Sequence, residues 1–207
     1  MRLFFPLFFV ALLSTCGPKP LDKYIAQKQY LKAAQHCKSL KGAEKKACFA
    51  RVAPLYEKEG RLRQAIYCWG QAENHERAKA VIMKLAQVFV DKEDYDTAIA
   101  MYEKIGATAQ IRVIHVRLGQ EQLRQGHIRE ASRFFKEAGD EKRLKTAYKK
   151  MGDSLYAKKM YKRSIKWYRK AEAPVAHLYL KIARRLLKRR AYFQAIPYFQ
   201  LANVKAR

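Results

Sequence analysis

The chain has 207 residues, of which 49% are apolar and 30% charged, with only nine glycines and six prolines. It is long enough and apolar enough to bury a continuous core, which excludes a chain without a folded domain. Lys and Arg number 44 against 18 Asp and Glu, so the formal net charge is +26 and the protein carries a strong positive field.

The first fifteen residues have the pattern of a signal peptide. Met1 and Arg2 supply a positive start, and residues 3–13 form an apolar run. This run is far shorter than the ~20 residues that a membrane-spanning helix needs, so it predicts export rather than a span. Cys16 follows the run after Ser14 and Thr15.

A cysteine in this place resembles the lipobox of bacterial lipoproteins. The resemblance implies that residues 1–15 are removed, that Cys16 is acylated with palmitate-like chains, and that two or three such chains hold the mature protein on a membrane. Gly17 follows the cysteine where an aspartate retains some lipoproteins in the inner membrane, so outer-membrane placement is favoured in a diderm cell. An ordinary secretory signal cut near the same place is the alternative.

Residues 16–20 are predicted to form the lipidated cysteine and a short extended tether. Two prolines and a glycine, Gly17, Pro18 and Pro20, keep this segment out of the first helix. Residues 21–207 then form the folded domain, close to the bilayer that holds the anchor.

One helical pattern recurs six times along this domain. The copies begin at intervals of 32, 33, 33, 33 and 31 residues, at Tyr30, Leu62, Tyr95, Ile128, Tyr161 and Tyr192. Three positions after each start stands a small residue: Ala33, Ala65, Ala98, Ala131, Ser164 or Ala195. Seven positions after it stands an aromatic residue in five copies (Trp69, Tyr102, Phe135, Tyr168, Phe199) and Cys37 in the first. These offsets place the shared side chains on one face of an α-helix.

A second helical stretch precedes each copy in the same register. Its landmarks are Leu85-Ala86, Leu118-Gly119, Met151-Gly152 and Ile182-Ala183, with turn glycines at Gly60 and Gly126. Two helices per period of about 33 residues, with these landmarks, resemble the tetratricopeptide-repeat family over roughly residues 21–203. The resemblance implies an all-α fold, a right-handed α-solenoid of about six helix-turn-helix repeats.

The chain departs from this family in lacking the proline that commonly closes each repeat. The positions after the second helix hold Glu73-Asn74, Gly106-Ala107, Gly139-Asp140 and Glu172-Ala173 instead. The last repeat ends close to Arg207, so either the basic tail solvates this end or the end meets a partner.

The four cysteines fall into three groups. Cys16 is assigned to the lipid, and Cys37 and Cys48 flank a polar turn, so they are expected to face each other on antiparallel helices. Export permits a disulfide there, and two buried thiols in the core are the alternative. Cys68 is predicted to pack as a free thiol, and the spacing is not that of a metal site.

No catalytic or cofactor-binding pattern is present. The histidines His36, His75, His115, His127 and His177 are scattered, and no nucleophile elbow or phosphate-binding loop occurs. Glu121 and Glu130 are interpreted as surface charges rather than as an acid–base pair. The sequence therefore predicts a non-catalytic protein without a metal or cofactor.

Basic residues recur at one position of the repeat. Eleven residues before five of the starts stand Arg51, Lys84, Arg117, Lys150 and Lys181, which we call the ladder residues. In tetratricopeptide arrays the first helix of each repeat lines a concave groove, so the resemblance implies a row of cations suited to an acidic or extended segment of a partner. The alternative is that these residues border the groove and stay solvated.

The family's carboxylate clamp, which grips a C-terminal carboxylate, is not complete in this chain. Arg117, Lys149, Lys150 and Lys181 supply cations, but Gln120 and Asp153 stand where the clamp asparagines are expected. Capture of a C-terminus in this way is therefore not predicted.

The excess charge lies toward the C-terminus, in residues 142–190, which we call the basic segment. It holds 18 Lys or Arg against two acids, Asp153 and Glu172. Aromatic residues there (Tyr161, Trp167, Tyr168, Tyr192, Tyr198, Phe199) mostly follow the core register, which disfavours nucleic acid as a partner. The favoured partners are envelope proteins with acidic or extended segments, which the protein binds as a scaffold or assembly factor. The alternative partner is a polyanion or an anionic membrane surface.

Overall fold

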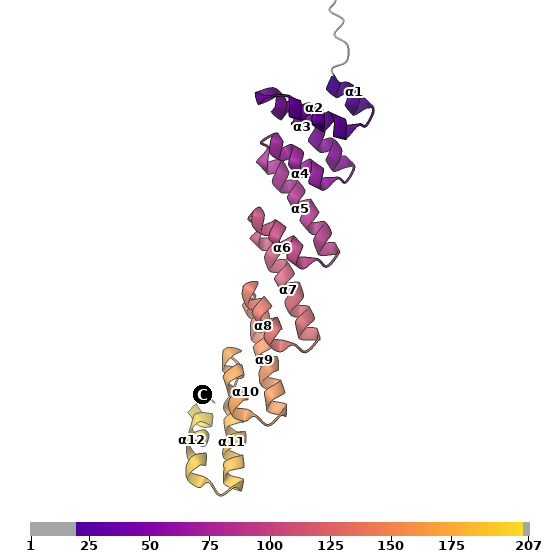
Figure 1. Cartoon of the computed structure of the whole chain (residues 1–207). Helices are drawn as coiled ribbons and strands as arrows, with labels where there is room; N and C mark the ends of the chain where they lie inside the picture. Colours follow the sequence, from indigo (N-terminus) through magenta and orange to yellow (C-terminus); the bar gives the residue numbers. More distant parts are fainter. Residues whose placement is uncertain (1–19, 205–207) are drawn as a thin grey trace, which may run out of the picture. The chain divides into compact units, whose positions relative to one another are not determined.

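The computed structural model describes residues 20–204, and all regular structure in that range is helical. The predicted signal peptide and Cys16 lie outside it. The helices are α1 (Pro20–Ala26), α2 (Tyr30–Ser39), α3 (Gly42–Lys58), α4 (Leu62–Gln71), α5 (His75–Asp91), α6 (Tyr95–Lys104), α7 (Thr108–Arg124), α8 (Ile128–Glu137), α9 (Glu141–Ala157), α10 (Tyr161–Lys170), α11 (Ala176–Lys188) and α12 (Tyr192–Val204). Helices α1 and α2, α3 and α4, α7 and α8, α9 and α10, and α11 and α12 pack as helical hairpins (Figure 1), so the expected all-α architecture of helix-turn-helix repeats, of the α-solenoid class, is confirmed.

The chain divides into two compact units. Unit 1 ends at Lys92 and unit 2 begins at Glu93. Unit 1 contains α1 to α5, and unit 2 contains α6 to α12. Each unit has its own buried core, built from the facing sides of neighbouring helices.

The even-numbered helices begin at the six residues where the repeat pattern begins. The small residue three positions later is 0% or 1% exposed in every copy, from Ala33 to Ala195. Alanine there lets the two helices of a hairpin approach closely, and the aromatic residue beside it fills the remaining space. Ser164 is buried too, and its hydroxyl donates a hydrogen bond of 2.8 Å to the Gly152 carbonyl across the hairpin.

Glycines in two odd-numbered helices make room for the aromatic residue of the same repeat. A Cβ atom on Gly119 would stand 2.7 Å from the Phe135 ring, and one on Gly152 would stand 2.8 Å from the Tyr168 ring. Ala86 and Ala183, at the equivalent places in other repeats, are fully buried. The aromatic ring and the small residue therefore form one packing unit.

Each hairpin turn contains one residue in the left-handed region, two positions before the second helix. Glycine fills it at Gly60 and Gly126, and the other four turns hold Lys28, Glu93, Lys159 and Arg190 with φ between 55° and 61°. Sequence alone indicated the turn only where glycine stands. Between repeats, Glu73, Gly106, Gly139 and Glu172 have positive φ as well, a conformation that proline cannot adopt.

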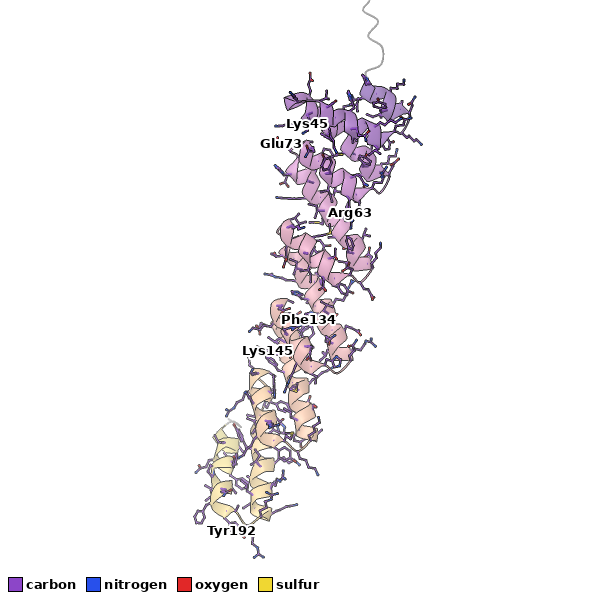
Figure 2. All side chains as sticks on the ribbon, viewed as in Figure 1. Lys45, Arg63, Glu73, Phe134, Lys145 and Tyr192 are labelled. Carbon is purple, nitrogen blue, oxygen red and sulfur yellow. A yellow bond between two sulfur atoms is a disulfide. The ribbon has the colours of Figure 1, made fainter. Side chains whose placement is uncertain are left out.

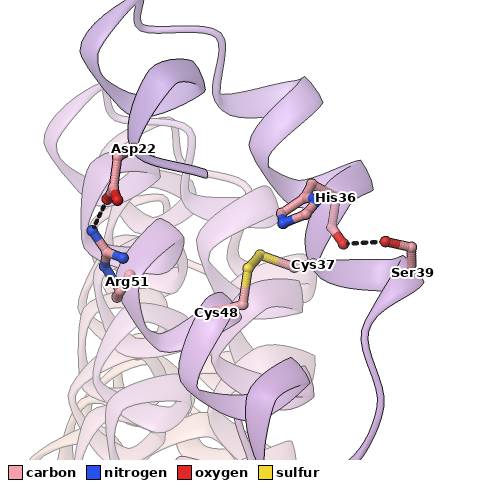
Figure 3. The surroundings of a disulfide bond; sticks show 6 residues. All are labelled: Asp22, His36, Cys37, Ser39, Cys48 and Arg51. Carbon is pink, nitrogen blue, oxygen red and sulfur yellow. Dashed lines mark hydrogen bonds and ion pairs between the residues drawn. A yellow bond between two sulfur atoms is a disulfide. The ribbon is translucent and has the colours of Figure 1, made fainter. Parts of the chain in front are cut away.

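Unit 1 contains a disulfide between Cys37 of α2 and Cys48 of α3 (Figure 3). The two Cα atoms are 5.4 Å apart, and both residues are buried. Cys68 is a buried free thiol, and burial raises its pKa to about 11.

Pro20 requires one correction to the predicted tether. We expected it outside the first helix, but α1 begins at Pro20. Proline suits the first position of a helix because the amide hydrogen that it lacks would have no partner there.

Candidate functional site: the ladder residues and the basic segment

The five ladder residues lie on α3, α5, α7, α9 and α11, and all are exposed. Each stands two positions before a small, buried residue of its own helix. Two positions correspond to about 200° around a helix, so each ladder side chain points away from that buried residue. That all five form a single row stays a prediction.

In unit 1 both ladder residues are paired with acids of the chain itself. The Arg51 guanidinium lies 2.5 Å from an Asp22 carboxylate oxygen (Figure 3), and the Lys84 ammonium lies 3.0 Å from Glu57. Each acid comes from the first helix of the preceding repeat. The charge of these two cations is therefore already compensated.

Glu57 is fixed by two donors. Besides Lys84, the indole Nε1 of Trp69 donates a hydrogen bond of 2.6 Å to its carboxylate. Partial burial alone raises the pKa of Glu57, but these hydrogen bonds outweigh it and hold the pKa below its ordinary value. Glu57 is thus a charged structural residue that ties three helices of unit 1 together.

In unit 2 the ladder residues are not compensated. Arg117, Lys150 and Lys181 form no ion pair with any residue between 20 and 204. The positions equivalent to Glu57 hold Leu123 before Lys150 and Tyr156 before Lys181. These cations are therefore open to an external anion, in contrast to Arg51 and Lys84.

The two acids of the basic segment neutralise little of its charge. Asp153 accepts a hydrogen bond from the Tyr168 hydroxyl, and Glu172 pairs with Lys145 at 2.6 Å. Burial and the neighbouring Asp153 carboxylate raise the pKa of Tyr168 to about 12. Asp153 is therefore engaged by the second helix of its own hairpin.

A cavity of about 500 Å³ opens between the α9–α10 turn and α11. Its apolar lining comes from Met160, Tyr161, Ile182 and Leu186, and its polar lining is entirely basic: Lys159, Lys162, Arg163, Arg185 and Arg189. None of these five cations forms an ion pair with a described residue. The cavity therefore combines an apolar surface with an uncompensated positive rim.

A second cavity, of about 670 Å³, occupies the equivalent place two repeats earlier in unit 2. Tyr95 and Leu118 correspond to Tyr161 and Ile182 in the repeat register. The positions of three of the cations hold other residues: Glu93 in place of Lys159, Glu121 in place of Arg185 and Gln125 in place of Arg189. Because Arg117 and Arg124 also line this second cavity, its two acids and two cations cancel, whereas the first cavity carries five cations and no acid. Positive charge at this place of the repeat therefore increases along unit 2.

The remaining polar residues show no catalytic arrangement in the described range. Glu121 is bound by Arg124 and Gln125, whose hydrogen bonds lower its pKa, and Glu130 is exposed. His115 lies 3.8 Å from Glu137, and its buried Nδ1 has no hydrogen-bond partner there. No group of three His, Cys, Asp or Glu residues between 20 and 204 has the arrangement of a metal site.

Most of the aromatic residues of the C-terminal half pack as expected. Tyr168 is buried, and Trp167 lies against Tyr148 with ring centroids 5.5 Å apart. Tyr192 and Phe193 at the start of α12 are exceptions, because they are 58% and 90% exposed. No helix within residues 20–204 is both long enough and apolar enough to cross a bilayer.

Comparisons with known proteins do not assign the chain to a family. No protein-family profile matches the chain, and no curated protein does. Among solved structures, BtubC (BKLC) from P. vanneervenii is 18% identical over 90% of this chain and 88% of its own, with a TM-score of 0.26. A likeness of this extent carries no argument about fold or function, so the resemblance to tetratricopeptide repeats stays an interpretation of the residues.

Reasoning from the sequence missed two groups of residues. The first comprises Asp22 and Glu57, which occupy the ladder residues of unit 1. The second comprises the lining of the basic cavity. A comparison of the repeats position by position would have detected the change from Glu93 and Glu121 to Lys159 and Arg185.

Proposed function

We propose that the protein is a non-catalytic, membrane-anchored lipoprotein of the bacterial cell envelope with tetratricopeptide-like repeats. It acts as a scaffold or assembly factor by binding acidic or extended segments of envelope proteins. The observation that carries this proposal is the difference between the two units. Arg51 and Lys84 have carboxylate partners within the chain, whereas Arg117, Lys150 and Lys181 have none among residues 20–204.

Binding takes place along unit 2. Three exposed cations at the repeat spacing match an extended segment with carboxylates at intervals, because each cation meets one part of the segment. The cavity near α11 is lined by five cations, and the cavity near α7 by two cations and two acids, so such a segment has a preferred direction, with its more acidic end toward α11. The lipid on Cys16 keeps the protein at the membrane where its partners are.

The test is charge reversal with a matched control. One variant carries Arg117→Glu, Lys150→Glu and Lys181→Glu. The control carries Arg129→Glu, Lys136→Glu and Lys166→Glu, three exposed cations on even-numbered helices of the same unit. Both variants lose the same net charge, so a general loss of positive field affects them equally.

Binding of a fluorescent, Glu-rich extended peptide is measured by anisotropy at several salt concentrations. We expect the ladder variant to bind about tenfold more weakly than the control. Equal weakening of both variants, with a steep salt dependence, would instead indicate a polyanion binder through the basic segment. Crosslinking and mass spectrometry in intact cells then identify the partner, whose crosslinks should map to α7, α9 and α11.

A further inference from the structure

Helix α12 (Tyr192–Val204) contains no charged residue, in a chain of which 30% is charged. Its inner side packs on α11 through Ala195 and Ala202, which are 1% and 3% exposed. Its outer side carries Phe193, which is 90% exposed, with Ile196 at 51% and Leu201 at 40%. The same helix also exposes three uncharged polar residues, Gln194, Gln200 and Asn203. A helix with large apolar side chains on its outer as well as its inner side normally has apolar surroundings on both sides. Among residues 20–204, such surroundings exist only on the side of α12 that packs on α11.

The repeat register shows that this outer side is unusual. The position of Phe193 holds an exposed charged residue in each of the four preceding repeats: Arg63, Asp96, Arg129 and Lys162. The position of Leu201 holds the half-buried, uncharged Gln71 and the exposed, charged Lys104, Glu137 and Lys170. These residues stay at the surface although another helix follows each of them in the same unit. Burying Phe193 and Leu201 therefore requires a broader apolar surface than one further helix.

Cations adjoin this apolar side. Lys188, Arg189 and Arg190 stand directly before α12, all three are exposed, and none forms an ion pair with a described residue. They surround the turn at which Figure 2 labels Tyr192, itself 58% exposed. A second copy of the chain would bring the same cations into opposition, so charge disfavours self-association here. A negatively charged apolar partner is favoured.

We propose that α12 and the turn before it dock on an anionic lipid bilayer. Phe193, Ile196 and Leu201 enter the boundary between headgroups and acyl chains, and Lys188, Arg189 and Arg190 contact lipid phosphates. A bilayer offers the broad apolar surface that Phe193 and Leu201 require, and an anionic one supplies the counter-charge. This contact involves none of the ladder residues and does not depend on the binding of a protein partner.

The experiment measures insertion at α12 itself, because binding of the whole chain to vesicles does not show which segment enters the bilayer. The full chain with Phe193→Trp is mixed with vesicles of equal parts phosphatidylglycerol and phosphatidylcholine that carry bromine on their acyl chains. We expect a blue shift and quenching of the added tryptophan, above the signal of Trp69 and Trp167 in the unsubstituted chain. Pure phosphatidylcholine vesicles should give neither effect.

A matched control places tryptophan at another exposed apolar position, Val113→Trp, where the native side chain is 62% exposed on α7. This variant should show no quenching. Adding Arg189→Gln and Arg190→Gln to Phe193→Trp should raise the lipid concentration needed for half-maximal quenching about 30-fold.

Two results would overturn the proposal. The first is an unquenched Phe193→Trp chain that nevertheless sediments with the anionic vesicles, since another segment then holds it there. The second is a dimer without lipid that Phe193→Ser dissociates in sedimentation velocity, since a second copy then covers α12.

Discussion

At the scale of single residues, small side chains decide how closely the two helices of a hairpin pack. Gly119 and Gly152 leave space that one aromatic ring fills, and Ser164 satisfies its hydroxyl on the Gly152 carbonyl. In the hairpin turns, four residues other than glycine hold a left-handed backbone, which lowers the stability of the fold. Both features lead to substitutions of known sign.

Gly152→Ala should destabilise unit 2 by about 1–3 kcal/mol, because the new methyl group overlaps the Tyr168 ring. Gly70→Ala is the matched control, since nothing lies within 4 Å of a Cβ atom there and alanine favours helix by up to about 1 kcal/mol. Urea unfolding of both variants measures the difference. A Gly152→Ala variant that is as stable as the native protein, or more stable, would contradict the packing described.

Glu93→Gly should stabilise unit 2 by about 1 kcal/mol, since the left-handed backbone at φ 61° costs a residue with a Cβ atom more than it costs glycine. The reciprocal change Gly126→Ala, at the equivalent turn, should destabilise by a similar amount. Thermal unfolding monitored by circular dichroism compares the two. A loss of stability in Glu93→Gly would show that the turn gains nothing from glycine.

Glu57 predicts a dependence of stability on pH. Its pKa is lower in the folded protein than its ordinary value of 4.5, so its contribution is fully present above pH 4.5 and disappears as the pH falls through the lowered pKa. Glu57→Gln should therefore flatten the free energy of unfolding of unit 1 against pH in this acidic range. Trp69 fluorescence follows the transition, and an unchanged pH profile in Glu57→Gln would exclude the role of Glu57.

At the scale of helices, one disulfide supports the first repeat. Helix α1 has 7 residues where the other first helices have 13 or 17, so it covers α2 and α3 less well. The Cys37–Cys48 bond joins α2 to α3 at this thin end of unit 1. The bond closes a loop across 11 positions of sequence, which restricts the unfolded chain.

Reduction of this bond should lower the stability of unit 1 by about 2–4 kcal/mol. Thermal unfolding with and without reductant measures the loss. The double variant Cys37→Ala and Cys48→Ala is the control, because reductant should leave its transition unchanged while Cys68 stays buried in both proteins. A reductant effect of the same size in the double variant would assign the loss to another cause.

At the scale of the whole molecule, charge divides the chain by role. The ladder cations of unit 1 form internal ion pairs, and those of unit 2 form none with a residue that the structure describes. Electrostatic attraction to a membrane is screened beyond about a Debye length, roughly 8 Å at physiological salt. The proposed anchor would hold the cations within this distance of lipid and of membrane-bound partners. The anchor is therefore the first property of the whole chain to test.

Cys16→Ser should abolish incorporation of an alkyne-tagged fatty acid in cells and release the protein from the membrane fraction. Cys68→Ser is the control, since this buried thiol should leave labelling intact. A secreted, unlabelled native protein whose new N-terminus lies near Cys16 would replace the lipoprotein interpretation with an ordinary secretory signal.

The sequence by itself determined the period, the starts of the even-numbered helices and the buried small and aromatic positions. These features depend on side-chain size within one repeat, and a 33-residue spacing displays them without any knowledge of distant contacts. It also indicated that Cys37 and Cys48 face each other, because both flank one turn. It left open whether they are bonded, since two buried thiols fit the same pattern.

Only the tertiary structure decided which cations are free. Arg51 and Lys181 occupy the same position of the repeat. Asp22 of the preceding repeat forms an ion pair with Arg51, and no described residue forms one with Lys181. Likewise, Ile165 and Ile196 share a register position but differ in exposure. Ile165 is 7% exposed because α11 covers it, and Ile196 is 51% exposed because no described helix does. Pairing and cover depend on neighbours that a repeat pattern does not specify, and these neighbours determine which residues remain available to a partner.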